Sequence, residues 1–338
     1  MRAALIGLGM VSRTYADVFR TSDKVTLAAV CARSAESREA FLSANPDLGA
    51  VAMTVDEIAA DPGVDFAILT TPPNARAEIV GKLAAAGKPI LMEKPVERNV
   101  AGATRLVELC EAKGVPLGIV LQHRARPVVS ELRHVMSGLG PLRAAEVNVP
   151  WWRPQSYYDA PGRGTYGRDG GGVLISQAIH TLDLMLTLTG PVASVTAMVA
   201  TTGFHRMEAE DFVCAGLRFA NGAVGQLFAT TASFPGRGET ITLHFRDGSV
   251  HLEAGLLRID RQDGTSETIG QAAASGAGAD PMAFTSDWHR TIVEDFAEAV
   301  SAERAPLVPG REALKVHRLI AALEKSGEQG GEVLLEEG

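Results

Sequence analysis

The sequence has few cysteines, no excess of positive charge and no long apolar run. Its three cysteines, Cys31, Cys110 and Cys214, are odd in number and form no Cys-x-x-Cys pair, which indicates a reducing compartment and predicts no metal site. The formal charge of -8 argues against nucleic acid or an anionic membrane surface as the main partner. No apolar run approaches the roughly 18 residues of a membrane-spanning helix. Because the chain opens directly on an apolar strand at residues 3–6, without a secretory leader, we expect a cytoplasmic protein.

The 338 residues are too many for one ordinary core, and the pattern changes near residue 121. Up to there, short β-like runs alternate with helical segments of about 10 to 15 residues, which predicts a doubly wound domain with a parallel sheet over residues 1–121. Residues 122–338 combine helices near 127–137, 173–189, 289–301 and 311–326 with closely spaced strands between 192 and 260. This part is predicted to be an α+β domain with a large, mostly antiparallel sheet. Residues 271–280 are predicted to be a loop, and the acidic end at 332–338 is expected to fray.

A glycine-rich turn follows the first predicted strand. In the run Gly7, Leu8, Gly9, Met10, Val11, the first glycine allows a tight turn and the second allows a diphosphate to approach a helix N-terminus. This strand–turn–helix context predicts dinucleotide binding, although the same run also suits a tight turn without a ligand. The second strand ends without the acidic residue that binds the 2'-hydroxyl of NAD, and Arg33 and Ser34 stand there instead. They favour NADP(H) over NAD(H), unless Arg33 only stacks on adenine or points into water.

Two further segments carry groups suited to proton transfer. Lys94 follows a predicted strand in Glu93-Lys94-Pro95, where it would point into the crevice at the carboxyl edge of the sheet, although Lys-Pro at a strand end is often only a structural turn. The helix predicted after Gly170-Gly171-Gly172 is apolar nearly all round, except for one polar stripe that carries Ser176, His180, Asp183 and Thr187. His180 is therefore either a core histidine with a satisfied partner or a residue facing a cavity.

Taken together, these motifs resemble the Gfo/Idh/MocA oxidoreductase family. The resemblance covers nearly the whole chain and includes residues 70–74, Ala86-Gly87-Lys88 leading to Glu93-Lys94-Pro95, residues 122–124 and 170–190, and the closing helix from Pro309. It implies a Rossmann domain followed by an α/β domain whose open sheet usually forms an oligomer interface, so that a homodimer or homotetramer is expected. It also implies that Lys94 and His180 are the catalytic pair. By the same resemblance, Thr71, Pro72, Asn74, Glu93, Lys94 and Gln122 line the cofactor site.

The sequence departs from the family pattern at two positions. Many members have an aspartate four residues before the histidine, where this chain has Ser176, which can orient an imidazole or bind substrate but cannot hold a charge. Asp183 is then a candidate orienting partner. The family's usual histidine after the Thr-Pro-Pro turn is here Arg76, to which the sequence assigns no role.

We expect an NAD(P)-dependent dehydrogenase or reductase that transfers a hydride to or from a carbinol carbon of a sugar, sugar acid or cyclitol. The Ser176-Gln177 version of the histidine helix is closest to family branches acting on sugars, including nucleotide-linked uronic acids. Aromatic side chains suit the C–H face of a sugar, and arginines suit a carboxylate or phosphate, which makes an anionic substrate plausible unless the arginines only form surface ion pairs. The candidate substrate residues are Trp152, Arg153, Tyr157, Tyr158, Arg163, Tyr166, Arg168, Ser176, Gln177, Asp183 and His289. The alternatives are a cyclic dihydrodiol dehydrogenase, an NAD-dependent glycosidase with transient oxidation, and a non-catalytic dinucleotide sensor.

Overall fold

A computed structural model describes residues 1–273 and 276–335 of the chain. The chain divides into two compact units, one of residues 1–125 and 286–314 and the other of residues 126–285 and 315–338. The predicted loop at 271–280 and the predicted frayed end at 332–338 lie partly outside the described residues. No helix in the described ranges is both long enough and apolar enough to cross a membrane.

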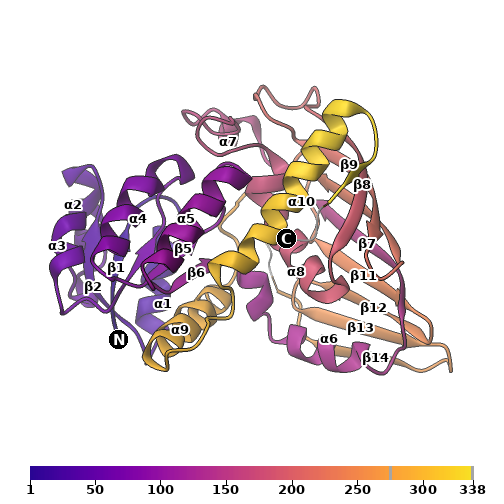
Figure 1. Ribbon diagram of the computed structural model, residues 1–338, viewed down its shortest axis with the longest axis horizontal. Helices are drawn as coiled ribbons and strands as arrows, with labels where there is room; N and C mark the ends of the chain where they lie inside the picture. Colours follow the sequence, from indigo (N-terminus) through magenta and orange to yellow (C-terminus); the bar gives the residue numbers. More distant parts are fainter. Residues whose placement is uncertain (274–275, 336–338) are drawn as a thin grey trace. The chain divides into compact units, whose positions relative to one another are not determined.

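The described residues of the first unit form a six-stranded parallel sheet with the order β3-β2-β1-β4-β5-β6 (Figure 1). This is the order of a Rossmann fold, as predicted. Strands β2 and β3 follow on one side of β1, and the chain then crosses to the other side of β1, where β4, β5 and β6 follow, so the strand order reverses between β1 and β4. The central strands are apolar throughout because helices cover both faces. The strands are β1 (Arg2–Ile6), β2 (Thr26–Cys31), β3 (Val51–Ala52), β4 (Phe66–Leu69), β5 (Ile90–Glu93) and β6 (Leu117–Val120).

Helices α1 (Ser12–Thr21), α2 (Ala35–Ala44), α3 (Val55–Ala60), α4 (Arg76–Ala85) and α5 (Val100–Ala112) connect these strands. Helix α9 (Asp287–Ser301) also belongs to the first unit, although the sequence prediction placed it in the domain at 122–338. Its buried residues recur at the three- and four-residue spacing of an amphipathic helix, and Phe296 packs 5.4 Å from Phe66 of β4, between ring centroids. Burial of this stripe against the parallel sheet explains the assignment.

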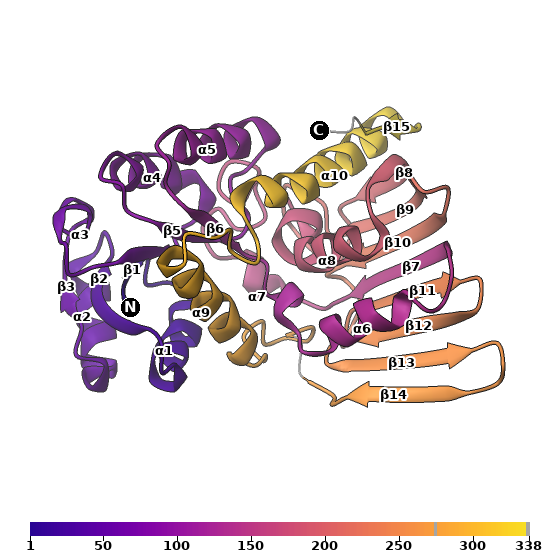
Figure 2. The ribbon, with the colours of Figure 1, turned by 60° about the horizontal axis from the view of Figure 1, so that its bottom comes forward.

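The second unit contains a nine-stranded sheet with the order β14-β13-β12-β11-β7-β10-β9-β8-β15 among its described residues (Figure 2). Its neighbouring strands are antiparallel, as predicted, except for the pair β7 and β10. The strands are β7 (Leu142–Pro150), β8 (Val192–Ala200), β9 (Phe212–Phe219), β10 (Val224–Thr230), β11 (Thr240–Phe245), β12 (Gly248–Glu253), β13 (Leu256–Arg261), β14 (Ser266–Gly270) and β15 (Val333–Leu334).

Three of these strands, β7, β14 and β15, were missing from the prediction. Strand β7 lies in the interior of the sheet, and its alternation of buried Ala145, Val147 and Val149 with outward Glu146 and Asn148 is the signal that could have identified it. Strand β15 pairs with β8, so the described part of the acidic end does not fray as expected.

Helices α6 (Val128–Met136), α8 (Ile179–Thr189) and the second-unit part of α10 (Gly310–Gln329) lie on one face of this sheet (Figures 1 and 2). The short helix α7 (Gln155–Tyr158) follows β7. Directly before α8, residues Leu174–Ala178 form a π-helical turn. A π turn adds one residue to the helical repeat. The prediction of one regular stripe is therefore wrong, because Ser176 lies in the π turn whereas His180 and Asp183 lie in the α-helix after it.

Candidate functional site

The glycine-rich turn lies at the point where the strand order of the first unit reverses. Gly7 has φ +106°, and a Cβ at this position would lie 2.8 Å from the main-chain N of Thr71. The turn after β1 therefore packs directly against the turn after β4, which only glycine permits. Ligands of open parallel sheets bind in the crevice at such a reversal, outside the carboxyl ends of the strands.

The residues around this turn fit a dinucleotide. Helix α1 begins without a side-chain cap at Val11, which leaves N–H groups of its first turn for an anion. Gly9 is exposed, and a Cβ there would meet no described atom within 4 Å. Among the described residues, Thr71 Oγ1 and Gln122 Oε1 are buried without a hydrogen-bond partner. Both follow parallel strands at the same edge, so a ligand bound there would satisfy them.

The remaining predicted cofactor residues lie at this edge as well. Leu8 is half-buried and Met10 is 49% exposed, while Pro72 and Asn74 are exposed on the turn after β4. At the end of β2, Arg33 is exposed and Ser34 caps α2 by accepting a hydrogen bond from the main-chain N–H of Ser37 at 3.2 Å. An exposed guanidinium beside a helix N-terminus is suited to an adenosine phosphate, which is the arrangement that the prediction of NADP(H) requires.

A buried polar cluster surrounds the turn after β5. The Tyr15 hydroxyl donates to Glu93 Oε1 at 2.8 Å, the main-chain N–H of Lys94 donates to Glu93 Oε2 at 3.2 Å, and His289 Nε2 lies 3.8 Å from Glu93 Oε1. The Lys94–Pro95 peptide bond is cis. Burial raises the pKa of Glu93, although the Lys94 cation opposes this. Burial, together with the Lys94 cation, lowers the pKa of His289 to about 3, so this imidazole is neutral at pH 7.

In the second unit, the helix that carries His180 is anchored at its start by Glu210. The carboxylate accepts hydrogen bonds from the main-chain N–H groups of Gly172 and Leu174, both at 2.9 Å, and the Glu210 carbonyl accepts one from Val173 at 2.8 Å. A Cβ on Gly172 would lie 1.7 Å from the Glu210 carbonyl oxygen. The last glycine of the triple-glycine run is thus required by close packing. His180, 6% exposed, and Asp183, 1% exposed, follow on the same buried helix.

Several predicted substrate residues come together beside this helix. Arg163 donates to the Tyr157 hydroxyl and lies over its ring at 4.3 Å, and Gln177 Nε2 donates to the same hydroxyl at 3.4 Å. Within the described residues, Gln177 Oε1 and Arg168 Nη1 are buried without a hydrogen-bond partner. The neutral acceptor oxygen of Gln177 and the cationic donor of Arg168 are therefore available to a ligand. Tyr166 is exposed and Ser176 is half-buried.

The Arg153 guanidinium makes hydrogen bonds to main-chain carbonyl groups of the protein. Only 2% exposed, it donates to the carbonyl oxygens of Trp152, Gly276 and Gly278 at 2.5 to 2.8 Å. Its guanidinium also lies 5.1 Å from the ring centre of Trp151. Trp152, in contrast, is half-buried and stacks edge-to-face with the exposed Phe204 and Phe234.

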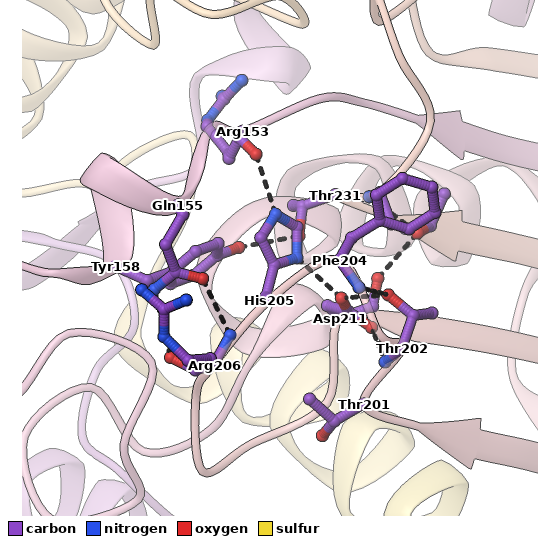
Figure 3. Close-up of polar contacts among 12 residues, drawn as sticks. Arg153, Gln155, Tyr158, Thr201, Thr202, Phe204, His205, Arg206, Asp211 and Thr231 are labelled. Atoms are coloured by element: carbon purple, nitrogen blue, oxygen red, sulfur yellow. Dashed lines mark hydrogen bonds and ion pairs between the residues drawn. The ribbon is translucent and has the colours of Figure 1, made fainter.

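A buried network that the sequence did not predict holds the segment with Arg153 and Tyr158 in place (Figure 3). His205 Nδ1 lies 2.6 Å from Asp211 Oδ2, and its Nε2 donates to the Arg153 carbonyl at 2.8 Å, since a carbonyl can only accept. The Tyr158 hydroxyl lies 2.7 Å from Thr231 Oγ1. The loop at 201–211 therefore packs against and stabilises the segment around Arg153 that carries candidate substrate residues. Histidine and aspartate six residues apart gave no local pattern from which this pair could be read.

Comparison with known proteins agrees with this architecture. Residues 1–120 match the description "Oxidoreductase family, NAD-binding Rossmann fold", and residues 133–251 match the Gfo/Idh/MocA C-terminal domain. The chain belongs to the Gfo/Idh/MocA oxidoreductase family. As a member of this family it is an NAD(P)-dependent oxidoreductase, which confirms the predicted class of enzyme and cofactor.

Three relatives show the range within this Gfo/Idh/MocA family. The WlbA dehydrogenase of Bordetella pertussis, solved with NADH and UDP-GlcNAcA, is 28% identical, with a TM-score of 0.83 and coverage of 100% of this chain and 99% of that one. A D-apiose dehydrogenase of Paraburkholderia graminis is 25% identical over 99% of this chain and 89% of its own. A putative UDP-kanosamine synthase oxidoreductase subunit of Amycolatopsis mediterranei is 34% identical over 69% of this chain and 62% of its own.

The candidate residues divide between the two units of this Gfo/Idh/MocA protein. His289 belongs to the first unit, with Lys94 and the cofactor residues. The other candidate substrate residues and His180 belong to the second unit. Sequence reasoning missed Tyr15 and the function of Arg76, because their contacts with the turn after β5 join positions that are far apart in the chain.

Proposed function

We propose that this protein transfers a hydride between a nicotinamide cofactor and a carbinol carbon of a sugar, sugar acid or cyclitol. The observation that carries the proposal is the placement of Lys94 at the carboxyl edge of the Rossmann sheet, beside the buried Glu93 and His289 and at the same edge as the glycine-rich turn. The relatives support the substrate class, since they include a D-apiose dehydrogenase and a 1,5-anhydro-D-fructose reductase.

Lys94 and His180 are the proposed proton-handling pair. The bound nicotinamide supplies the hydride acceptor or donor, and the protein supplies alignment and a route for the proton. In the oxidative direction, the His180 imidazole takes the hydroxyl proton, and the Lys94 ammonium donates a hydrogen bond to the same oxygen as the carbonyl forms. Ser176 and Asp183 are proposed to orient His180, and Gln177 to contact the substrate.

We propose an anionic sugar or a nucleotide-linked sugar acid as the preferred substrate. The free donor of Arg168, the Arg163–Tyr157 pair and the aromatic Trp152 support it, as does the UDP-linked uronic acid bound to the WlbA dehydrogenase. Tyr158 and Arg153 hold this stretch of the second unit through the contacts described above, and His289 of the first unit is proposed to contact the substrate.

The proposal extends to cofactor preference and assembly. Arg33 and Ser34 support a preference for NADP(H), because both stand at the end of β2 where NAD-specific proteins place an acid. An Arg33→Ala variant is expected to lose at least about tenfold in kcat/KM with NADP and little with NAD.

The sheet face of the second unit opposite its helices carries the exposed Met198 and Val224. These exposed apolar side chains support the proposal of a homodimer or homotetramer formed through this sheet.

The deciding experiment is a screen of D-glucose, D-glucuronate, UDP-glucuronate and myo-inositol with NAD and with NADP, followed by absorbance at 340 nm. Lys94→Ala and His180→Ala are each expected to lower kcat by on the order of 100-fold on the best substrate. Full activity in both variants would contradict the assignment. Hydrolysis of a glycoside without net change in absorbance would instead favour the NAD-dependent glycosidase.

A further inference from the structure

Arg76 is a buried cation whose side-chain hydrogen bonds within the described residues go to main-chain carbonyl groups. It is 2% exposed at the start of α4. Its Nε and Nη2 donate to the Thr71 carbonyl at 3.0 and 2.8 Å, and its Nη1 donates to the carbonyls of Glu93 and Pro95. A buried guanidinium needs such partners, because each donor removed from water without a hydrogen bond costs free energy.

These contacts join two turns that are separate in the sequence. Thr71 lies after β4, beside the glycine-rich turn, while Glu93 and Pro95 flank Lys94 on both sides after β5. The planar guanidinium spreads its donors over a rigid fork, so one side chain can fix both turns at once. The main chain on each side of Lys94 is therefore held relative to the turn after β4.

The electrostatic surroundings keep this cation charged. Burial lowers the pKa of Arg76 to about 10, and the negative charges of Glu93 and Glu97 oppose that decrease. Arg76 is thus protonated at pH 7 and donates through every N–H group that these carbonyls require.

We propose that Arg76 is a positioning residue, which sets the direction of Lys94 by holding the carbonyls on both sides of it to the turn after β4. The inference deepens the proposed function and rests on the catalytic role proposed for Lys94. It assigns a role to the position where this chain departs from the family's usual histidine.

Three variants test the role in the full-length protein. Arg76→Met removes the donors, and Arg76→Lys keeps a cation that can still reach some of the carbonyls. Lys88→Met is the matched control, because Lys88 is also a buried cation that donates to carbonyls, those of Asp61 and Val64, but it precedes β5 rather than follows it. Both methionine variants are expected to lower Tm. Only Arg76→Met is expected to lower kcat, by about 10-fold or more, and Arg76→Lys to recover part of that loss.

A readout independent of turnover is the acylation rate of the Lys94 amine. Acetic anhydride labelling followed by mass spectrometry reports it, with the exposed Lys113 as internal reference. The labelling rate of Lys94 relative to Lys113 is expected to change at least about threefold in Arg76→Met and to stay constant in Lys88→Met. An unchanged ratio in Arg76→Met would overturn the proposal.

A double-mutant cycle separates this inference from the proposed function. In a Lys94→Ala background, Arg76→Met is expected to lower the residual rate less than twofold. Equal losses in the two backgrounds would show that Arg76 acts independently of Lys94. If Lys94→Ala alone keeps the wild-type kcat, the proposed function fails instead. Should Arg76→Met not fold, Arg76→Lys is taken through the same cycle and judged by the same criteria.

Discussion

Tyr15 of α1 donates its hydroxyl hydrogen to the buried carboxylate of Glu93 at the end of β5, with 2.8 Å between the two oxygens. The hydrogen bond joins a helix that begins at the glycine-rich turn to the strand that ends directly before Lys94. Its environment is wholly buried, and burial raises the pKa of Tyr15 well above its ordinary value. This phenol is therefore a structural donor to Glu93 rather than an acid that titrates near neutral pH.

Tyr15→Phe tests the strength of this contact. The substitution keeps the ring but leaves a buried carboxylate oxygen without its donor, which is expected to lower the free energy of unfolding by about 1–3 kcal/mol. Urea denaturation measures the change. Tyr166→Phe, at a position 46% exposed, is the control and is expected to change stability by no more than about 0.5 kcal/mol. Equal stabilities for Tyr15→Phe and wild type would contradict the role given to this hydrogen bond.

Gly9→Val tests the dinucleotide site. A Cβ at Gly9 meets no described atom within 4 Å, so the variant is expected to fold with nearly wild-type stability. The added methyl groups would occupy the approach of the diphosphate, and the Kd for NADPH and NADH is expected to rise at least about tenfold, or ~1.4 kcal/mol. Cofactor fluorescence measures the Kd, with Gly81→Ala in α4 as control. Unchanged affinity in Gly9→Val would place the diphosphate elsewhere.

Gly172→Ala tests the packing beneath the His180 helix. Its Cβ would overlap the Glu210 carbonyl, which is main chain and cannot turn away, so we expect a loss of stability on the order of 3 kcal/mol. Gly216→Ala in β9 meets no described atom within 4 Å and serves as the control, with a gain of up to about 1 kcal/mol. Thermal unfolding distinguishes the two, and comparable Tm values would refute the packing argument.

Glu324 makes stability depend on pH. Burial and the neighbouring Glu210 raise its pKa from 4.5 to about 8. Between those values the folded protein holds a proton that the unfolded chain has released, so this group lowers stability as pH rises through the window and has no effect below it. Glu324→Gln stays neutral and is expected to be more stable than wild type at pH 8.5 but not at pH 4.5.

Urea denaturation across this pH range provides the measurement. Glu131→Gln, at an exposed position of α6, is the matched control and is expected to follow the wild-type curve. The interpretation of Glu324 fails if the Glu324→Gln variant and the wild type keep a constant difference in stability between pH 4.5 and pH 8.5.

Local sequence predicted most of the Rossmann half, without β3 and α3, and most of the second sheet. Apolar runs alternating with amphipathic helices predict the parallel order, and the pairs Asn221-Gly222, Asp247-Gly248 and Asp263-Gly264 all join adjacent antiparallel strands in the structure. Three short motifs could likewise be identified in the sequence, because each has its own backbone requirement. They are the glycine-rich turn, residues 93–95 and the glycine run before His180.

Contacts between distant positions were decided only by the tertiary structure. The sequence contained Arg76, Tyr15 and Glu210 but no signal that they reach Glu93, Pro95 and Gly172. It also did not show that α9 joins the first unit or that β7 runs parallel to β10. Periodicity and turn chemistry act over a few residues and therefore can be read along the chain, whereas a buried polar group finds its partner only when folding has brought the two segments together.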